Sequence, residues 1–180
     1  MITAVIAFLV AVNPGAASVA LARDWRTDRP VPVALGAGVA IVFLAALAGL
    51  ADPILDVLDL NLGTYRLGAG VVVAVAGLRA LVERARRGAD EPTTDVRLTG
   101  YVFFPTLVTP AAAVLAVSVG AGEGVVTALV GAAVAVVAGG LGVFHRRRIP
   151  ELLAGALVRL LGAGGVIIGI ALAFDGVKTL

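Results

Sequence analysis

The sequence predicts an all-α integral membrane protein of six transmembrane helices. The helices are expected to form two inverted three-helix repeats, with proline breaks in the first and fourth. Hydrophobic residues make up 60% of the chain and charged residues only 14%, whereas soluble domains carry about 25% charged residues. The chain also contains six apolar segments. Its basic residues gather in every second connection between these segments, which is the third observation. Residues 1–180 are therefore expected to form a single polytopic membrane domain.

Six segments approach the length of about 20 apolar residues that a helix needs to cross a bilayer. Charged or proline-containing stretches separate most of them, and the second segment lies between Arg29-Pro30 and Asp52-Pro53. The predicted spans are Ile2–Ala22, Val31–Ala51, Gly63–Val82, Leu98–Gly122, Gly124–Phe144 and Ala156–Phe174.

The first and fourth spans each carry a proline near the middle, in Asn13-Pro14-Gly15 and in Thr109-Pro110, 96 residues apart. A proline inside a helix removes one N–H donor and clashes with the preceding turn. Lipid tolerates the freed backbone groups only where protein or water satisfies them. Paired breaks of this kind are typical of transporter binding sites. The candidate substrate-binding residues are therefore Asn13, Pro14, Gly15, Thr109 and Pro110. Alternatively, Asn13 and Thr109 only satisfy the breaks or join neighbouring helices by hydrogen bonds.

The third and sixth spans also correspond, because Leu67-Gly68-Ala69-Gly70 resembles Leu161-Gly162-Ala163-Gly164 at an offset of 94 residues. Three spans in each half would make the second half enter the membrane from the opposite side, as an inverted repeat. The predicted repeats are residues 1–82 and 98–180, joined by a polar cytoplasmic linker at 83–97. Glycines allow close approach of helices, or they form a hinge. The candidate packing or hinge residues are Gly68, Gly70, Gly162, Gly164 and Gly165.

The distribution of basic residues predicts the orientation in the membrane. Twelve of the 14 lysines and arginines lie on the side of the connections after spans one, three and five. The positive-inside rule places this arginine-rich side in the cytoplasm and both termini outside. The expected location is the cell (plasma or inner) membrane, with the lipid bilayer as a partner. Because residues 1–9 contain no basic residue, the first segment is expected to stay as a membrane helix rather than to be a cleaved signal.

Several function classes are excluded or disfavoured by composition. The chain has no cysteine, which excludes disulfide and thiol chemistry. His145 is the only histidine, so we expect no metal site, and no catalytic motif or cofactor motif is present. Neither an enzyme nor a nucleic-acid-binding protein is predicted. No Asp, Glu or His lies clearly at mid-membrane, where a proton-coupled mechanism would place one. This absence favours facilitated movement, or coupling through groups nearer the surface. The uncharged residues Asn13 and Thr109 predict a neutral or zwitterionic solute.

The chain resembles the MarC family of integral membrane proteins, within the wider group of LysE-type exporters. Asn13-Pro14-Gly15, Tyr65 to Leu81 and Leu161 to Gly176 carry the resemblance, in order along nearly the whole chain. The chain departs from the family pattern at Thr109-Pro110-Ala111, where the family usually has Gly-Pro-Gly. The resemblance implies a divergent member with six helices, an inverted repeat and small-molecule export.

These observations predict a membrane transporter or exporter of a small solute, bound between the two repeats at the broken helices. The alternative is a non-transporting membrane scaffold or regulatory protein, which would have a tightly packed centre without a cavity at the prolines. The sequence leaves open the solute, the direction of movement and the formation of a homo-oligomer.

Overall fold

Helices form all the regular structure in the residues that the structure describes, which are 1–20, 30–82, 99–100, 102–145 and 150–180. The computed structural model therefore confirms the all-α class for these residues. The predicted linker at 83–97 and most of the arginine-rich connections lie outside them. In chain order the helices are α1 (Ile2–Val12), α2 (Pro14–Ala20), α3 (Pro30–Gly49), α4 (Ala51–Val57), α5 (Leu62–Val82), η1 (Val102–Leu107), α7 (Pro110–Glu123), α8 (Val125–Phe144) and α9 (Glu151–Lys178).

Four of these helices are long and apolar enough to cross a membrane. They cover Val31–Gly49, Leu62–Val82, Val125–Phe144 and Leu152–Lys178, and they correspond to the second, third, fifth and sixth predicted spans. The first and fourth predicted spans are not continuous helices. Each is divided into two shorter helices, α1 with α2 and η1 with α7. The prolines therefore interrupt the spans rather than only bending them.

The first break lies at Asn13, which adopts a left-handed conformation with φ 50° and ψ 78°. Asparagine tolerates this conformation better than most residues because its short polar side chain can bond locally. The Asn13 N–H still bonds the carbonyl of Leu9, which closes α1. Pro14 then begins α2, a position where its missing N–H and fixed φ suit a helix start.

The second break lies between η1 and α7. Thr109 is extended, with φ −86° and ψ 156°, because a residue before proline is driven out of the helical region. Pro110 begins α7. Upstream, η1 is irregular: Phe104 is extended inside it and is followed by Pro105. The second broken span is therefore interrupted twice within a few residues.

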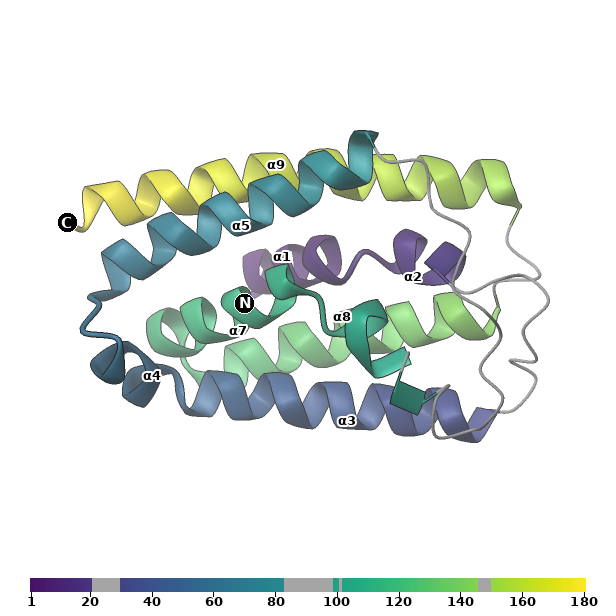
Figure 1. Ribbon diagram of the computed structural model, residues 1–180, viewed down its shortest axis with the longest axis horizontal. Helices are drawn as coiled ribbons and strands as arrows, with labels where there is room; N and C mark the ends of the chain where they lie inside the picture. The colour runs from purple at the N-terminus through teal and green to yellow at the C-terminus, as the bar shows by residue number, and fades with distance from the viewer. Residues whose placement is uncertain (21–29, 83–98, 101, 146–149) are drawn as a thin grey trace.

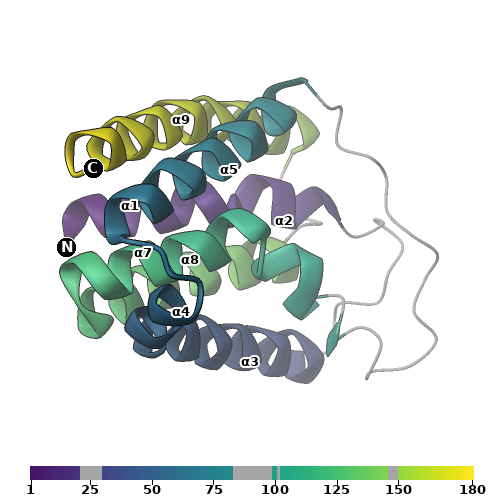
Figure 2. The same ribbon diagram turned by 60° about the vertical axis from the view of Figure 1, so that its left-hand side comes forward.

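The helices form three layers, with the broken spans in the middle (Figures 1 and 2). On one side α5 packs along α9, and on the other α3 packs along α8; α1, α2, η1 and α7 lie between these pairs. The ends of the helices that border the undescribed segments 21–29, 83–98 and 146–149 lie at one end of the molecule, and α4 lies at the other. Asp52, Asp56 and Asp59 are exposed at the end where α4 lies.

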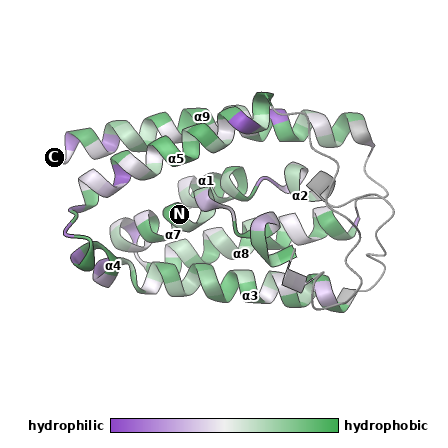
Figure 3. Ribbon diagram, viewed as in Figure 1, coloured by the Kyte–Doolittle hydropathy of each residue, from purple (hydrophilic) through white to green (hydrophobic). Residues whose placement is uncertain are grey.

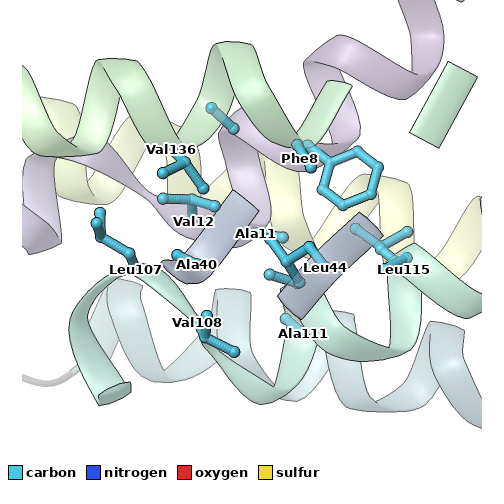
Figure 4. Packing of buried hydrophobic residues seen from close by; sticks show 14 of the residues in the cluster. Phe8, Ala11, Val12, Ala40, Leu44, Leu107, Val108, Ala111, Leu115 and Val136 are labelled. Carbon is cyan, nitrogen blue, oxygen red and sulfur yellow. The ribbon is translucent and has the colours of Figure 1, made fainter. Parts of the chain in front are cut away.

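The core lies around the broken helices, where Phe8 of α1, Leu44 of α3, Leu107 of η1 and Leu115 of α7 are almost fully buried (Figure 4). The long outer helices instead present hydrophobic residues outward along their length (Figure 3). Only 22% of the apolar stretch of α5 and 22% of that of α9 are buried. This distribution suits a protein surrounded by lipid, because the interrupted backbone is shielded inside the helices that face outward.

A seam of glycines brings α5 and α9 together. The paired residues are Gly63 with Gly176, Gly70 with Gly169, and Gly77 with Gly162. At five of these six glycines a Cβ atom would approach backbone atoms of the partner helix closer than 3.0 Å, and at Gly63 it would lie 2.7 Å from the Thr179 Oγ1 and 3.0 Å from the Gly176 oxygen. Only glycine therefore fits without a shift. Within each helix the glycines recur every seven residues, or two turns, which keeps them on one face.

The expected packing glycines are only partly those of this seam. Gly70 and Gly162 belong to it, and Gly165 packs against Gly77. Gly164 instead faces the side chain of Val10 in α1. Gly68 is exposed, and a Cβ there would meet nothing within 4 Å, so the expected packing contact is absent at this position. Gly68 and Gly70 point in different directions on a helix, and only Gly70 faces α9.

Candidate functional site

The two breaks lie against each other in the middle layer. The Thr109 hydroxyl donates a hydrogen bond to the backbone carbonyl of Ala11, with an oxygen–oxygen distance of 2.9 Å. Ala11 belongs to the last turn of α1, where carbonyl groups lack helical N–H partners. The second break therefore satisfies a group left over by the first.

Thr109 also caps the helix that follows it. Its hydroxyl oxygen accepts a hydrogen bond from the Ala112 N–H at 3.0 Å, which is the usual role of threonine at this position. The single hydroxyl hydrogen is already used in the bond to Ala11. Only one lone pair of the oxygen remains for a further partner, so Thr109 can accept but not donate another bond.

Asn13 has a similar double role at the first break and is buried. Its Oδ1 accepts a hydrogen bond from the Ala16 N–H at 3.1 Å, which caps α2. Its Nδ2 donates to the carbonyl of Val158 in α9 at 3.3 Å. The amide keeps one N–H and one lone pair beyond these bonds. Asn13 and Thr109 thus both satisfy the local breaks and join helices, which is what the alternative to substrate binding expects. Both also keep some capacity for further hydrogen bonds.

A cavity of about 200 Å³ opens beside these residues. Asn13 and Thr109 line it, whereas Pro14, Gly15 and Pro110 do not. Of the five residues predicted to bind substrate, two thus reach the cavity and three only shape the backbone around it. Hydrophobic residues and glycines form the remaining wall, and among them are Val10, Val73, Ala76, Gly77, Gly162 and Gly165.

Thr106 of η1 also lines the cavity, and it is not among the residues predicted from the sequence. It is only 6% exposed, yet its hydroxyl has no hydrogen-bond partner. A hydroxyl in a helix usually bonds the carbonyl four residues earlier, and this one does not. A buried unsatisfied hydroxyl costs about 1–3 kcal/mol. Its position between Pro105 and Pro110 is the signal that would have indicated it, since the disturbed backbone removes the usual acceptor.

No charged residue lines the cavity, among the residues that the structure describes. Nor does this part of the chain hold three His, Cys, Asp or Glu residues close enough to bind a metal ion. The described ion pair of two side chains, Arg66 Nη1 with Asp175 Oδ2 at 2.6 Å, joins α5 to α9. The site is therefore an uncharged one, able to hold a solute by hydrogen bonds and apolar contact.

Comparisons with protein-family models, with curated proteins and with solved structures give no match to this chain. The fold itself defines the class of protein. It is a helical protein in which four of the described helices are long and apolar enough to span a membrane. The resemblance to the MarC family stays a prediction.

Proposed function

We propose that the protein is a membrane transporter, or exporter, of a small neutral or zwitterionic solute that binds between the two repeats. The observation that carries the proposal is the cavity of about 200 Å³ at the junction of the two broken spans. The cavity holds Asn13, Thr106 and Thr109 in an otherwise apolar lining. Interrupted helices that meet at such a site are typical of secondary transporters.

The glycine seam supports the inverted repeat in this proposal. Gly63, Gly70 and Gly77 of α5 each have a glycine 99 residues later in α9. In the structure the first glycine of α5 contacts the last of these in α9, the second contacts the second, and the last contacts the first. A two-fold axis through the Gly70–Gly169 contact would produce this pattern, since it exchanges the two helices and maps the outer pairs onto each other. The same exchange would relate α3 to α8, and α1–α2 to η1–α7, which are also neighbours. The offset that we infer for these helices is 99 residues rather than 94.

The proposed orientation keeps the arginine-rich side in the cytoplasm. Arg79 and Arg159 are exposed near the ends of α5 and α9 that border undescribed segments. The opposite ends carry Arg66, Asp175 and the acidic α4. This asymmetry agrees with the positive-inside rule. A MarC-type relationship would explain the same arrangement, and we retain it as part of the proposal.

The competing function is a non-transporting scaffold. The hydrogen bonds of Asn13 and Thr109 to other helices favour it, because they give both residues a packing role. The cavity favours transport instead, because Asn13 and Thr109 keep hydrogen-bonding capacity where they line it.

Filling the cavity tests the proposal without breaking a hydrogen bond. Ala76 lines the cavity from α5, and Ala76→Leu would occupy part of its volume. Ala46 is exposed on α3, so Ala46→Leu is the matched control. Both variants and the wild type would be reconstituted into vesicles, and entry of small neutral and zwitterionic solutes would be followed by stopped-flow light scattering. We expect wild type and Ala46→Leu to speed entry of at least one solute, and Ala76→Leu to abolish the effect. The proposal would be refuted if solutes entered vesicles with the wild-type protein no faster than they entered protein-free vesicles. Equal rates of entry with Ala76→Leu and Ala46→Leu would refute it too.

A further inference from the structure

The cavity does not lie at the middle of the long helices. Its lining residues on α5 run from Val73 to Ala80, close to the helix end at Val82. At about 1.5 Å of rise per residue, Val73 is about 16 Å from the other end of α5, at Leu62. That other end lies beside α4 (Figure 1). The cavity is therefore nearer to the arginine-rich side, and a longer stretch of helix packing separates it from the α4 end.

Contacts of α5 with α7 and α9 close the region between the cavity and the α4 end. The Tyr65 hydroxyl donates a hydrogen bond to the Val114 carbonyl of α7, with an oxygen–oxygen distance of 3.4 Å. Arg66 forms its ion pair with Asp175 of α9. The Arg66 guanidinium also occupies the space that a Cβ atom at Gly122 of α7 would need. Arg66 thus contacts both the middle layer and the partner helix of α5.

The proposed repeat relates this closed region to the cavity. At the inferred offset of 99 residues, Arg66 corresponds to Gly165 and Asp175 corresponds to Ala76. Gly165 and Ala76 both line the cavity, whereas their two counterparts form the ion pair. Small residues therefore border a space in one half of the molecule, and a large ion pair takes the corresponding position in the other half.

We propose that Arg66 and Asp175, together with Tyr65, form a gate that closes the transport pathway at the α4 end. The structure is then the state in which the pathway is closed on that side, and the proposed orientation makes this side the outer one. The inference rests on the proposed transport function and adds a conformational state and its gate residues to it.

The contacts of the gate are of a kind that can open. The Asp175 side chain is 54% exposed, and ion pairs in contact with water contribute little to stability. The Tyr65 hydrogen bond is long at 3.4 Å. The buried Arg66 Nε has no hydrogen-bond partner in the part of the chain that the structure describes, so the closed state leaves one donor unsatisfied.

Access to Ala76 from each side of the membrane tests the closed state. The chain has no cysteine, so Ala76→Cys places a single reactive thiol in the lining of the cavity. A membrane-impermeant methanethiosulfonate would be added to right-side-out and to inverted membrane vesicles that contain the full-length protein. We expect faster reaction in inverted vesicles, which expose the arginine-rich side in the proposed orientation. Equal rates, or faster reaction in right-side-out vesicles, would overturn the inference.

Removal of the guanidinium then tests the gate. In the Ala76→Cys background, Arg66→Ala should raise the reaction rate in right-side-out vesicles about fivefold, which corresponds to about 1 kcal/mol, and should not raise the rate in inverted vesicles. Arg79→Ala is the matched control, because Arg79 is exposed near the other end of the same helix. An unchanged rate for Arg66→Ala, or an equal rise for Arg79→Ala, would overturn the gate. Faster reaction in both kinds of vesicle would overturn it too, since general loosening of the fold exposes the cavity from both sides.

Solute entry separates the failure of the gate from the failure of transport. If the wild-type protein speeds solute entry but Arg66→Ala leaves the labelling unchanged, only the gate is overturned. If the wild-type protein does not speed solute entry, the transport function is overturned, and the gate is overturned with it.

Discussion

Gly70 lies at the centre of the seam between α5 and α9, and Gly70→Ala tests how closely these helices must pack. A Cβ atom at this position would lie 2.5 Å from both the Gly169 carbonyl oxygen and the Ala173 nitrogen. Both are backbone atoms, so no side chain can move aside. Ordinary contact begins at 3.4 Å, and the two helices must therefore separate by about 1 Å at this level. A gap of about 0.5–1 Å already forfeits about a quarter to a half of the dispersion energy of a contact.

The matched control is Gly68→Ala, because Gly68 lies in the same helix with nothing within 4 Å of its Cβ position. Both substitutions carry the same gain in helix propensity, about 0.5–1 kcal/mol. Their difference thus isolates the packing penalty, which we expect to be about 1–3 kcal/mol, the usual range for overpacking. For a chain of this size the unfolding temperature of Gly70→Ala should be lower by about 2–4 °C for each kcal/mol. Thermal unfolding in one detergent, followed by circular dichroism, measures it. Equal unfolding temperatures for the two variants would refute the seam.

Two further predictions concern stability and use the same measurement. Asn13→Gly should lower the unfolding temperature less than Asn13→Ala. Both variants lose the hydrogen bonds of the amide, but only alanine is destabilised by about 1–2 kcal/mol in the left-handed conformation. Equal decreases in unfolding temperature would contradict this. Arg66→Gln and Asp175→Asn should show a coupling of about 0.5–1 kcal/mol in a double-mutant cycle. The coupling is small because the Asp175 side chain is 54% exposed, and strictly additive effects would show that the ion pair contributes nothing.

The helix breaks could be predicted from the sequence because a proline acts on its own turn. Pro14 and Pro110 each begin a helix, as local backbone chemistry requires. The long spans could be predicted because length and hydropathy are summed over many residues. The helix α4 was not expected, since Asp52-Pro53 indicates the end of a span; these residues instead form the first turn of α4, where both types are favourable.

The packing and the cavity could not be predicted in the same way because they depend on neighbours distant in sequence. The residues of α5 include Gly63, Gly68, Gly70 and Gly77, and their spacing alone does not tell which face meets α9. Likewise, Thr106 differs from other threonines only because it is buried without a hydrogen-bond partner. Burial and the absence of a partner are both properties of the folded chain. The polar residues next to the prolines were predictable, while the unpartnered hydroxyl was not.

The seam and the cavity share part of their structure, and this restricts how the site could open. Gly77 and Gly162 belong to the glycine seam between α5 and α9, and both also line the cavity. If α5 separated from α9, the contacts of the whole seam would be lost at once, because rigid helices meet there backbone to backbone. The middle layer packs less closely against this pair, although hydrogen bonds from Asn13 to Val158 and from Tyr65 to Val114 join them. In the proposed transport cycle, α5 and α9 are therefore expected to move together as one body against the broken helices, rather than to part.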